Sequence, residues 1–141
     1  MRLLIIHVDS FACTVTQKGR SPIIEQPSTA TTRIRDGLLV LASAEKGDEA
    51  DAAGVVARTA EEIASLAGQL KVAQVMLLPF AHLFAELAPP AEALALIDRV
   101  VVELRGRNLT VERPPFGWFH TWDMQAKGHP LSRVARTVRP A

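Results

Sequence analysis

The chain opens with the apolar run Arg2-Leu3-Leu4-Ile5-Ile6-His7-Val8-Asp9, which is rich in branched side chains and ends at a charge. A short run of this kind is typical of a strand buried in a sheet. Residues 11–17 alternate in polarity, and they predict a second strand joined to the first by a hairpin through Asp9-Ser10. The chain is therefore expected to begin by building a sheet.

Further along, residues 18–36 are loop-like and residues 38–44 predict a third strand. Asp51 is a candidate cap for a long helix that follows it. A run of residues 72–78 predicts another strand, which Pro79 ends. The apolar stripe of the helix has helical spacing and consists of Val55, Val56, Ile63, Leu66, Ala67 and Leu70.

A second long helix is predicted after residue 88. Residues 81–87 are expected to form one or two helical turns, and Pro89-Pro90 suits the first turn of the helix that follows. Gly106 is a typical helix end. The buried face of this helix is expected to contain Leu94, Ile97, Val101 and Leu104.

Two more strands, residues 109–112 and 119–125, are expected as a pair around the turn Pro114-Pro115-Phe116-Gly117. After residues 128–131, the tail is expected to form a short basic helix or strand. Strands that precede and alternate with two helices predict an α/β domain with a mixed sheet and the helices packed on it. The whole chain, residues 1–141, is expected to be one domain and the amino-terminal part of a longer protein.

Composition sets the broad class. The chain has 141 residues, 48% hydrophobic and 22% charged, which suits one globular domain with a core of its own. Cys13 is the only cysteine, so no intrachain disulfide can form and a reducing interior is indicated. The first apolar run is too short for a membrane span, so a cytoplasmic protein without membrane contact is expected.

Positive charge gathers in the last third of the chain, although the net charge is only +1. Acidic residues there include Glu112 and Asp123. This balance fits either a polyanion partner such as RNA or an ordinary solvated surface. The basic residues are Arg107, Arg113, Lys127, Arg133, Arg136 and Arg139.

The sequence lacks phosphate-binding glycine loops, the GxSxG elbow and the HExxH metal motif. His7 and Asp9 form an H-x-D pair that fits a metal site, although a buried polar pair is the commoner arrangement. Ser43, His82 and Asp9 are the members of a conceivable catalytic triad. Cys13 suits a small core residue better than a nucleophile.

His82 and His120 each follow a Pro-Phe segment in apolar surroundings, so either both face one pocket or each is a core histidine. Phe116, Trp118 and Phe119 form a cluster in a chain with few aromatic residues. The cluster fits either core packing or a stacking surface for a base of single-stranded RNA.

Several separated motifs resemble the amino-terminal editing domain of archaeal threonyl-tRNA synthetases. The resemblance extends from residue 1 to about 139. The segments that carry it are residues 4–9, residues 39–46, Leu78-Pro79-Phe80-Ala81-His82-Leu83, Glu86-Leu87-Ala88, Pro115-Phe116-Gly117 and Lys127-Gly128-His129-Pro130-Leu131.

This resemblance implies a fold like that of D-aminoacyl-tRNA deacylases: a mixed sheet or partial barrel with two long packed helices. It implies a homodimer that hydrolyses L-seryl-tRNA(Thr) and spares L-threonyl-tRNA(Thr). The expected partners are aminoacylated threonine tRNA and a catalytic threonyl-tRNA synthetase, on the same chain or a separate one. No cofactor and no metal are expected.

The resemblance also implies roles for particular residues. His82 and His120 are expected to be catalytic, His82 by orienting the substrate and His120 by placing water or the terminal ribose. Lys127, Arg133 and Arg136 are candidate phosphate contacts. The expected substrate pocket consists of Ala42, Ser43, Ala44, Pro79, Phe80, Ala81 and His82, and the expected contacts to the terminal adenosine are Pro115, Phe116, Gly117, Trp118 and Phe119.

Two positions depart from the family pattern. Phe119-His120 stands where relatives have Tyr-Lys, and Arg133 stands where they have a glutamate. Either this copy is inactive, or the 2′-hydroxyl of the terminal adenosine supplies what the side chains lack. We favour the second interpretation. A D-aminoacyl-tRNA deacylase and a non-catalytic tRNA-binding module are the alternatives.

Overall fold

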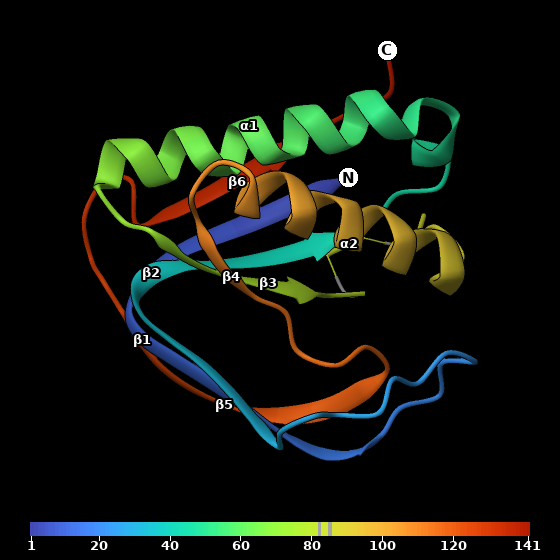
Figure 1. The fold of residues 1–141 in the computed structure, drawn as a ribbon, viewed down its shortest axis with the longest axis horizontal. Helices are drawn as coiled ribbons and strands as arrows, with labels where there is room; N and C mark the ends of the chain where they lie inside the picture. Colours follow the sequence, from blue (N-terminus) through green and yellow to red (C-terminus); the bar gives the residue numbers. More distant parts are fainter. Residues whose placement is uncertain (82, 85) are drawn as a thin grey trace.

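The computed structural model describes all residues except 82 and 85. Within that part of the chain, one six-stranded mixed sheet carries two long helices (Figure 1). The elements are β1 Arg2–Lys18, β2 Thr31–Ser43, a 3-10 turn η1 Asp48–Asp51, α1 Ala52–Leu70, β3 Gln74–Pro79, α2 Pro90–Arg105, β4 Thr110–Glu112, β5 Trp118–Ala126 and β6 Arg133–Thr137.

Strand β1 is continuous, so the hairpin predicted at Asp9-Ser10 is wrong. The strand pairs antiparallel with β2 from Arg2 opposite Ser43 to Thr14 opposite Thr31. Asp9 lies at a register shift in the pairing of β1 with β5, which is an irregularity of the ladder and does not reverse the chain. Strand β2 correspondingly begins at Thr31, earlier than the predicted residue 38.

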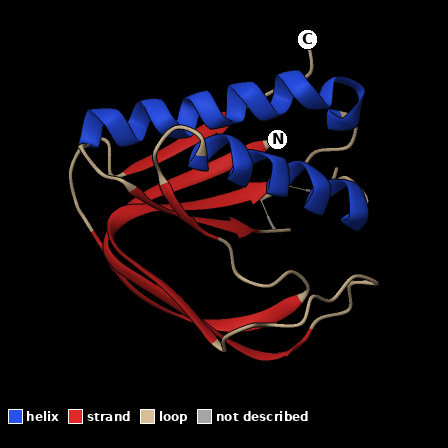
Figure 2. Cartoon of the chain, viewed as in Figure 1, coloured by secondary structure: helices blue, strands red, loops and turns tan. Residues whose placement is uncertain are grey.

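The other edge of β1 is shared by two strands. Strand β6 pairs with residues 2–6 of β1, and β5 pairs with residues 8–18. Figure 2 shows β1, β2 and β5 curving away from the helices, which gives the sheet the shape of a half-barrel. The expected mixed sheet or partial barrel with two long helices is therefore confirmed.

Strands β4 and β5 are not partners, which contradicts the predicted pair around the Pro-Pro-Phe-Gly turn. Strand β4 pairs in parallel with β3, while β5 pairs with β1. The segment that contains this turn therefore connects β4, at one edge of the sheet, to β5, at the opposite edge. Residues flanking a proline-rich turn resemble a hairpin locally, but their hydrogen bonds here go to distant strands.

Both helices are crossovers between parallel strands, α1 between β2 and β3 and α2 between β3 and β4. The Asp51 side chain accepts a hydrogen bond from Gly54 N at 3.3 Å, which confirms the predicted cap of α1. Helix α2 ends at Gly106 as predicted. Leu94 is only half-buried, whereas Leu96 is buried. The described residues among 81–87 are not helical, contrary to prediction.

The sheet is buried on both faces where the helices cover it. On β2, Leu38 and Val40 pack toward the helices, while Leu39 and Leu41 belong to a second cluster on the opposite face. This two-sided burial explains why residues 38–42 of β2 are a continuous apolar run. In the part of the chain that the structure describes, no helix has the length and apolar character needed to cross a membrane.

Candidate functional site

A cavity of about 390 Å³ opens at the carboxyl ends of the parallel strands β2 and β3. It extends beneath the first turn of α2 and along the segment of residues 114–122. Sites in α/β sheets often lie at such strand ends, because the connecting segments there converge from different elements. This cavity is therefore the candidate site.

The strand ends that form the floor of the cavity are tied together by hydrogen bonds. Phe80 N donates to Ala42 O at 2.9 Å, and Ala88 N donates to Ala44 O at 3.0 Å. The Ser43 hydroxyl donates to Phe80 O. These bonds hold small side chains at the cavity surface, and they leave little room for the floor to expand.

The structure brings together the expected substrate and adenosine positions that it describes. His82 lies outside the described residues, so its predicted role stays a prediction. The lining residues among those expected are Ala42, Ser43, Ala44, Pro79, Phe80, Ala81, Pro115, Phe116, Gly117, Trp118, Phe119 and His120.

One side of the cavity is formed by residues 114–120, which we call the wall segment. Gly117 has a φ of 93°, and a Cβ on it would lie 2.5 Å from Ile23 O. Only glycine adopts this conformation readily and allows this approach. Gly117 O also accepts a hydrogen bond from Gly19 N at 2.7 Å. The wall segment is therefore fastened to the loop that follows β1.

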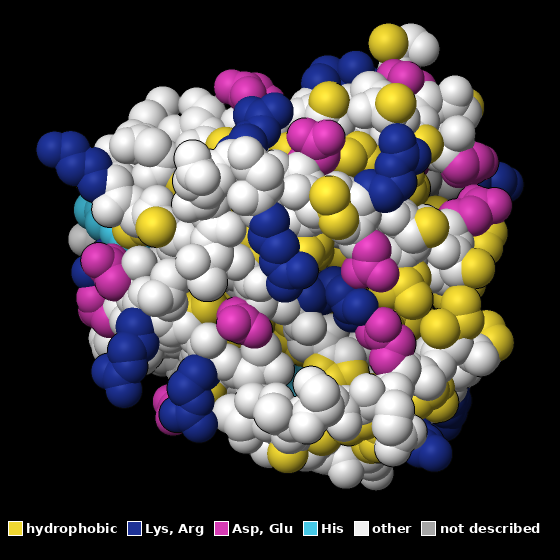
Figure 3. Space-filling view, in the orientation of Figure 1, with side chains coloured by type: hydrophobic (Ala, Val, Ile, Leu, Met, Phe, Trp, Pro, Cys, Tyr) yellow, Lys and Arg dark blue, Asp and Glu magenta, His cyan; other side chains and the backbone are white. Residues whose placement is uncertain are grey.

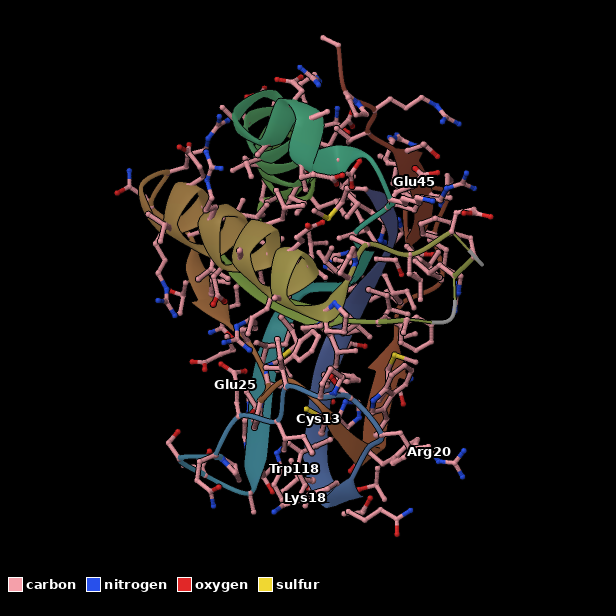
Figure 4. All side chains as sticks on the ribbon, turned by 90° about the vertical axis from the view of Figure 1, so that its right-hand side faces the viewer. Cys13, Lys18, Arg20, Glu25, Glu45 and Trp118 are labelled. Atoms are coloured by element: carbon pink, nitrogen blue, oxygen red, sulfur yellow. The ribbon has the colours of Figure 1, made fainter. Side chains whose placement is uncertain are left out.

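That loop, residues 19–30, holds the wall segment through Glu25. The Glu25 carboxylate accepts hydrogen bonds from Arg113 and from Phe116 N, and Glu25 O accepts one from Trp118 Nε1 at 2.7 Å. The Arg113 hydrogen bonds are the main cause that lowers the pKa of Glu25 below its usual value. In Figure 4, Glu25 and Trp118 lie beneath the helices, where this loop runs.

Strand β5 places His120 and Trp122 on the cavity surface two residues apart. The indole Nε1–H of Trp122 donates to His120 Nδ1 at 2.7 Å, and the two rings lie nearly edge to edge, with 23° between their planes and 6.0 Å between their centroids. Burial lowers the pKa of His120 below its usual value, because desolvation disfavours the imidazolium. His120 is therefore biased toward the neutral form near neutral pH.

Ionisable groups are scarce around the cavity. Among its described lining residues, His120 is the one ionisable side chain, and there is no carboxylate, lysine, arginine or cysteine. The remaining polar side chains are the hydroxyls of Ser21 and Ser43 and the indoles of Trp118 and Trp122. The site can bind and orient a ligand, but these side chains offer little acid–base chemistry.

The three predicted phosphate contacts do not line the cavity. Lys127 pairs with Asp9 and lies 4.0 Å from Asp36, and Arg136 pairs with Glu62 at 3.2 Å. Arg133 donates to Lys127 O at 3.2 Å. On the face drawn in Figure 3, lysine and arginine side chains are interspersed with acidic ones. A phosphate role for these residues stays a prediction.

The other candidate chemical groups take different positions. His7 is buried and contacts His129, with 2.9 Å between Nδ1 and Nε2, and it lies 3.3 Å from Asp36. Asp9 pairs with Lys127 instead of with His7, so the expected H-x-D pair does not form. The described residues contain no cluster of His, Cys, Asp and Glu that could hold a metal ion.

The proposed triad of Ser43, His82 and Asp9 is excluded by strand register. Ser43 lies opposite Arg2, and Asp9 is seven positions further along β1, roughly 23 Å away at the usual rise of a strand. Cys13 is buried in the core, as predicted, and burial raises the pKa of its thiol to about 11.

Several lining residues were not predicted from the sequence as site residues, among them Trp122, Pro90, Ala93 and Ile97. The two-residue period of a strand was a usable signal for Trp122, since it places this indole on the same face as His120. The α2 residues gave no comparable signal, because their place at the cavity depends on how α2 crosses the sheet.

A fold of this kind is found in a solved structure of the c-Myc DNA unwinding element binding protein. The TM-score is 0.67, with 14% sequence identity and full coverage of both chains. This likeness shows that the mixed sheet with two long helices is a fold shared with that protein. It concerns the fold alone, because the two sequences have diverged widely.

Sequence comparison identifies the family. A model of the archaea-specific editing domain of threonyl-tRNA synthetase matches residues 1–138. The threonine–tRNA ligase of Methanopyrus kandleri is 37% identical over 140 residues, and that of Thermococcus onnurineus is 38% identical over 144 residues. These matches cover 99% and 100% of this chain but only 22% and 23% of the two ligases.

The chain belongs to the archaea-specific editing domain family of threonyl-tRNA synthetase. The expected family is thus confirmed, and with it aminoacyl-tRNA deacylation in proofreading as the class of activity. The chain spans about a fifth of the length of these ligases. The matches therefore establish the family of this domain but not its substrate, its partners or its site residues.

Proposed function

We propose that the cavity hydrolyses the ester of L-seryl-tRNA(Thr) and spares L-threonyl-tRNA(Thr). Serine lacks one methyl of threonine, and one methyl changes binding by only about 1–3 kcal/mol in a pocket built for the larger residue. A second site that is too small for threonine supplies further discrimination. The small side chains of Ala42, Ser43, Ala44 and Ala81 around the cavity support this proposal.

The wall segment suits the terminal adenosine of the tRNA. Phe116, Trp118 and Phe119 supply aromatic surface, and the Phe119 side chain is 53% exposed. A base can stack on such a surface without sequence-specific contacts. This binding mode positions the ester over the strand ends at Ala42 and Ala81.

Hydrolysis requires that water attack the ester carbonyl carbon and that the bond from this carbon to the ribose oxygen break. The freed ribose oxygen takes up a proton, and the amino acid leaves as a carboxylate. The observation that carries our mechanism is the lack of a carboxylate, lysine or cysteine among the described lining residues. We infer that the 2′-hydroxyl of the terminal adenosine helps to place or activate the water.

In this mechanism the protein contributes position and hydrogen-bond donors. Main-chain groups at the ends of β2 and β3 stabilise the negative charge that develops on the carbonyl oxygen. His120 orients water or the terminal ribose from the side of β5. Arg133 stands where the resemblance implies a glutamate, and this scheme needs no side-chain base at that position.

The decisive experiment measures deacylation of L-seryl-tRNA and L-threonyl-tRNA, both on threonine tRNA, with and without the terminal 2′-hydroxyl. We expect rapid loss of serine alone, and only when the hydroxyl is present. An L-seryl ester hydrolysed equally well without the hydroxyl would overturn the RNA-assisted mechanism. A D-seryl ester hydrolysed in preference to the L-seryl ester would instead indicate a D-aminoacyl-tRNA deacylase.

His120→Ala tests how far side chains contribute. We expect a partial loss of deacylation, about tenfold to a hundredfold, because a positioning donor is removed while the 2′-hydroxyl remains. Circular dichroism provides the control for folding. Complete loss of activity in a folded variant would restore a mechanism that depends on the side chain.

We further propose that the domain forms a homodimer through the exposed side of β5. This strand ends the sheet order, and its side chains Trp122 and Met124, which share one face, are each 39% exposed. Exposed edge strands of this kind readily pair with another chain. Met124→Glu, away from the cavity lining, is expected to shift a dimer to monomer in light scattering. An unchanged mass would place any dimer contact elsewhere.

The proposed substrate also defines the remaining partners. Threonine tRNA is charged by threonyl-tRNA synthetase, so we propose that this domain works beside that enzyme in the cytoplasm, on the same chain or a separate one. The basic residues Lys127, Arg133 and Arg136 would then contact tRNA phosphates outside the cavity. Binding through phosphates weakens as salt increases, which a titration of tRNA binding at several salt concentrations measures.

A further inference from the structure

The hydrogen bond between Trp122 and His120 determines which ring nitrogen of His120 carries the proton, and it also orients the His120 ring. An indole N–H is only a donor, so His120 Nδ1 must present its lone pair to Trp122 Nε1, 2.7 Å away. A neutral imidazole carries one ring proton. Because Nδ1 is the acceptor, the proton of neutral His120 resides on Nε2.

The donor in this pair, Trp122, is partly exposed and is oriented by contacts with two other aromatic rings. The indole of Trp122 packs edge-on against the buried ring of Phe11 at 5.7 Å and lies 6.0 Å from the ring of Phe80. The planes of the Trp122 and His120 rings differ by only 23°, so the hydrogen bond lies close to both ring planes. These contacts restrict the orientation of the Trp122 indole relative to β1.

We propose that Trp122 is a positioning residue that locks His120 in the Nε2–H tautomer, so that His120 acts as a hydrogen-bond donor in the cavity and not as a base. Nε2 has no hydrogen-bond partner among the described residues, and His120 lines the cavity. A base would need a free lone pair on the nitrogen that faces the substrate. In His120 the nitrogen that remains free to meet a ligand is Nε2, and it carries the proton.

The proposal rests on the proposed deacylation for the identity of the acceptor. An oxygen of the ester, of the attacking water or of the terminal ribose accepts the Nε2–H bond. The lowered pKa of His120, caused by burial, agrees with this assignment because the neutral form prevails.

The tautomer is measured without any substrate, by nitrogen NMR of protein labelled at its histidines. In the wild-type protein, His120 is expected to show a protonated Nε2 and an unprotonated Nδ1 at pH 8. In Trp122→Phe, which keeps an aromatic ring, the His120 signals are expected to move toward a mixture of tautomers. His120→Gln provides the assignment of the His120 signals.

Trp118→Phe is the matched control. It removes another indole N–H at the cavity, one that donates to Glu25 O and not to His120. The nitrogen signals of His120 are expected to stay unchanged in this variant. A wild-type spectrum with the proton on Nδ1 overturns the proposal, even if the Trp122 variant fails to fold. An unchanged tautomer in folded Trp122→Phe overturns it as well.

Deacylation gives an independent readout. Trp122→Phe is expected to slow single-turnover hydrolysis of L-seryl-tRNA(Thr) by about threefold to tenfold, as the loss of one orienting hydrogen bond implies. If Trp122→Phe gives a mixture of His120 tautomers but leaves the rate of hydrolysis unchanged, Trp122 is not a positioning residue for this reaction. If the wild-type domain hydrolyses no ester, the proposed function fails, while the tautomer measurement still decides the state of His120.

Discussion

Glu25 and Arg113 form a bidentate ion pair beside the cavity. Oε1 of Glu25 lies 2.6 Å from Arg113 Nη1, and Oε2 lies 2.8 Å from Nη2. The same carboxylate accepts a hydrogen bond from Phe116 N at 2.7 Å, and Arg113 Nε pairs with Asp98 of α2 at 2.7 Å. The pair therefore connects the loop of residues 19–30, the wall segment and α2. It shapes the cavity without being part of its surface.

Glu25→Gln is expected to destabilise the domain. The substitution keeps the size of the side chain but removes the charge and one acceptor, and hydrogen bonds to charged groups contribute about 1.5–3 kcal/mol each. We expect a loss of about 1–2 kcal/mol in the free energy of unfolding, since both side chains are partly exposed. Urea denaturation measures it, with Glu103→Gln on the exposed face of α2 as the control. Equal stability of the two variants would contradict this role of Glu25.

The same pair predicts how stability depends on pH. The pKa of Glu25 is lowered in the folded state, mainly by its hydrogen bonds to Arg113. The folded state therefore binds this proton less readily than the unfolded state, and stability is lost as the pH falls through the folded pKa. The gap in unfolding free energy between the wild type and Glu25→Gln should be full at pH 7 and shrink toward pH 3. A gap independent of pH would show that the carboxylate charge contributes nothing.

The helices could be predicted from local signals. Asp51 caps α1 and Gly106 ends α2 because caps depend on the few residues around them. The buried stripe of α1 also follows from local spacing, since Val55, Ile63 and Leu66 recur on one face. Each of these features depends only on residues within one or two helical turns, so it can be predicted from the local sequence.

The strand partners could not be predicted in the same way. Asp9-Ser10 has the residue types of a turn, yet β2 pairs along nearly all of β1 and keeps the chain extended. Strand β5 binds β1, more than a hundred residues earlier, instead of its sequence neighbour β4. Register and partner depend on which apolar face is buried, and this is a property of the assembled sheet.

The candidate site was predictable where it follows strand ends and motifs. Ala42 and Pro79 meet because β2 and β3 are parallel neighbours. The contribution of Glu25 was not visible, because its partner Arg113 is 88 residues away. Trp122 was missed for a different reason: its bond to His120 is local, but an aromatic residue in a strand suggests packing first.

Ala81→Leu is expected to impair deacylation without unfolding the domain. Ala81 lines the cavity but is exposed, so a larger side chain occupies space meant for the substrate and does not crowd the core. We expect the rate on L-seryl-tRNA(Thr) to fall about tenfold or more, with the free energy of unfolding changed by less than about 0.5 kcal/mol. Ala95→Leu, on the exposed side of α2, is the matched control. Wild-type rates in Ala81→Leu would remove this position from the substrate pocket.

Cys13 is expected to resist alkylation in the folded domain. Its side chain is buried between β2 and β5, and burial raises the pKa of the thiol from 9.0 to about 11. The reactive thiolate is therefore about a hundredfold scarcer near pH 8 than in an unfolded chain, and access is blocked as well. Iodoacetamide labelling followed by mass spectrometry should be slow in buffer and fast in concentrated urea. Fast labelling of the folded protein would mean that β5 separates from β1 readily, and the cavity wall at His120 and Trp122 would then be mobile too.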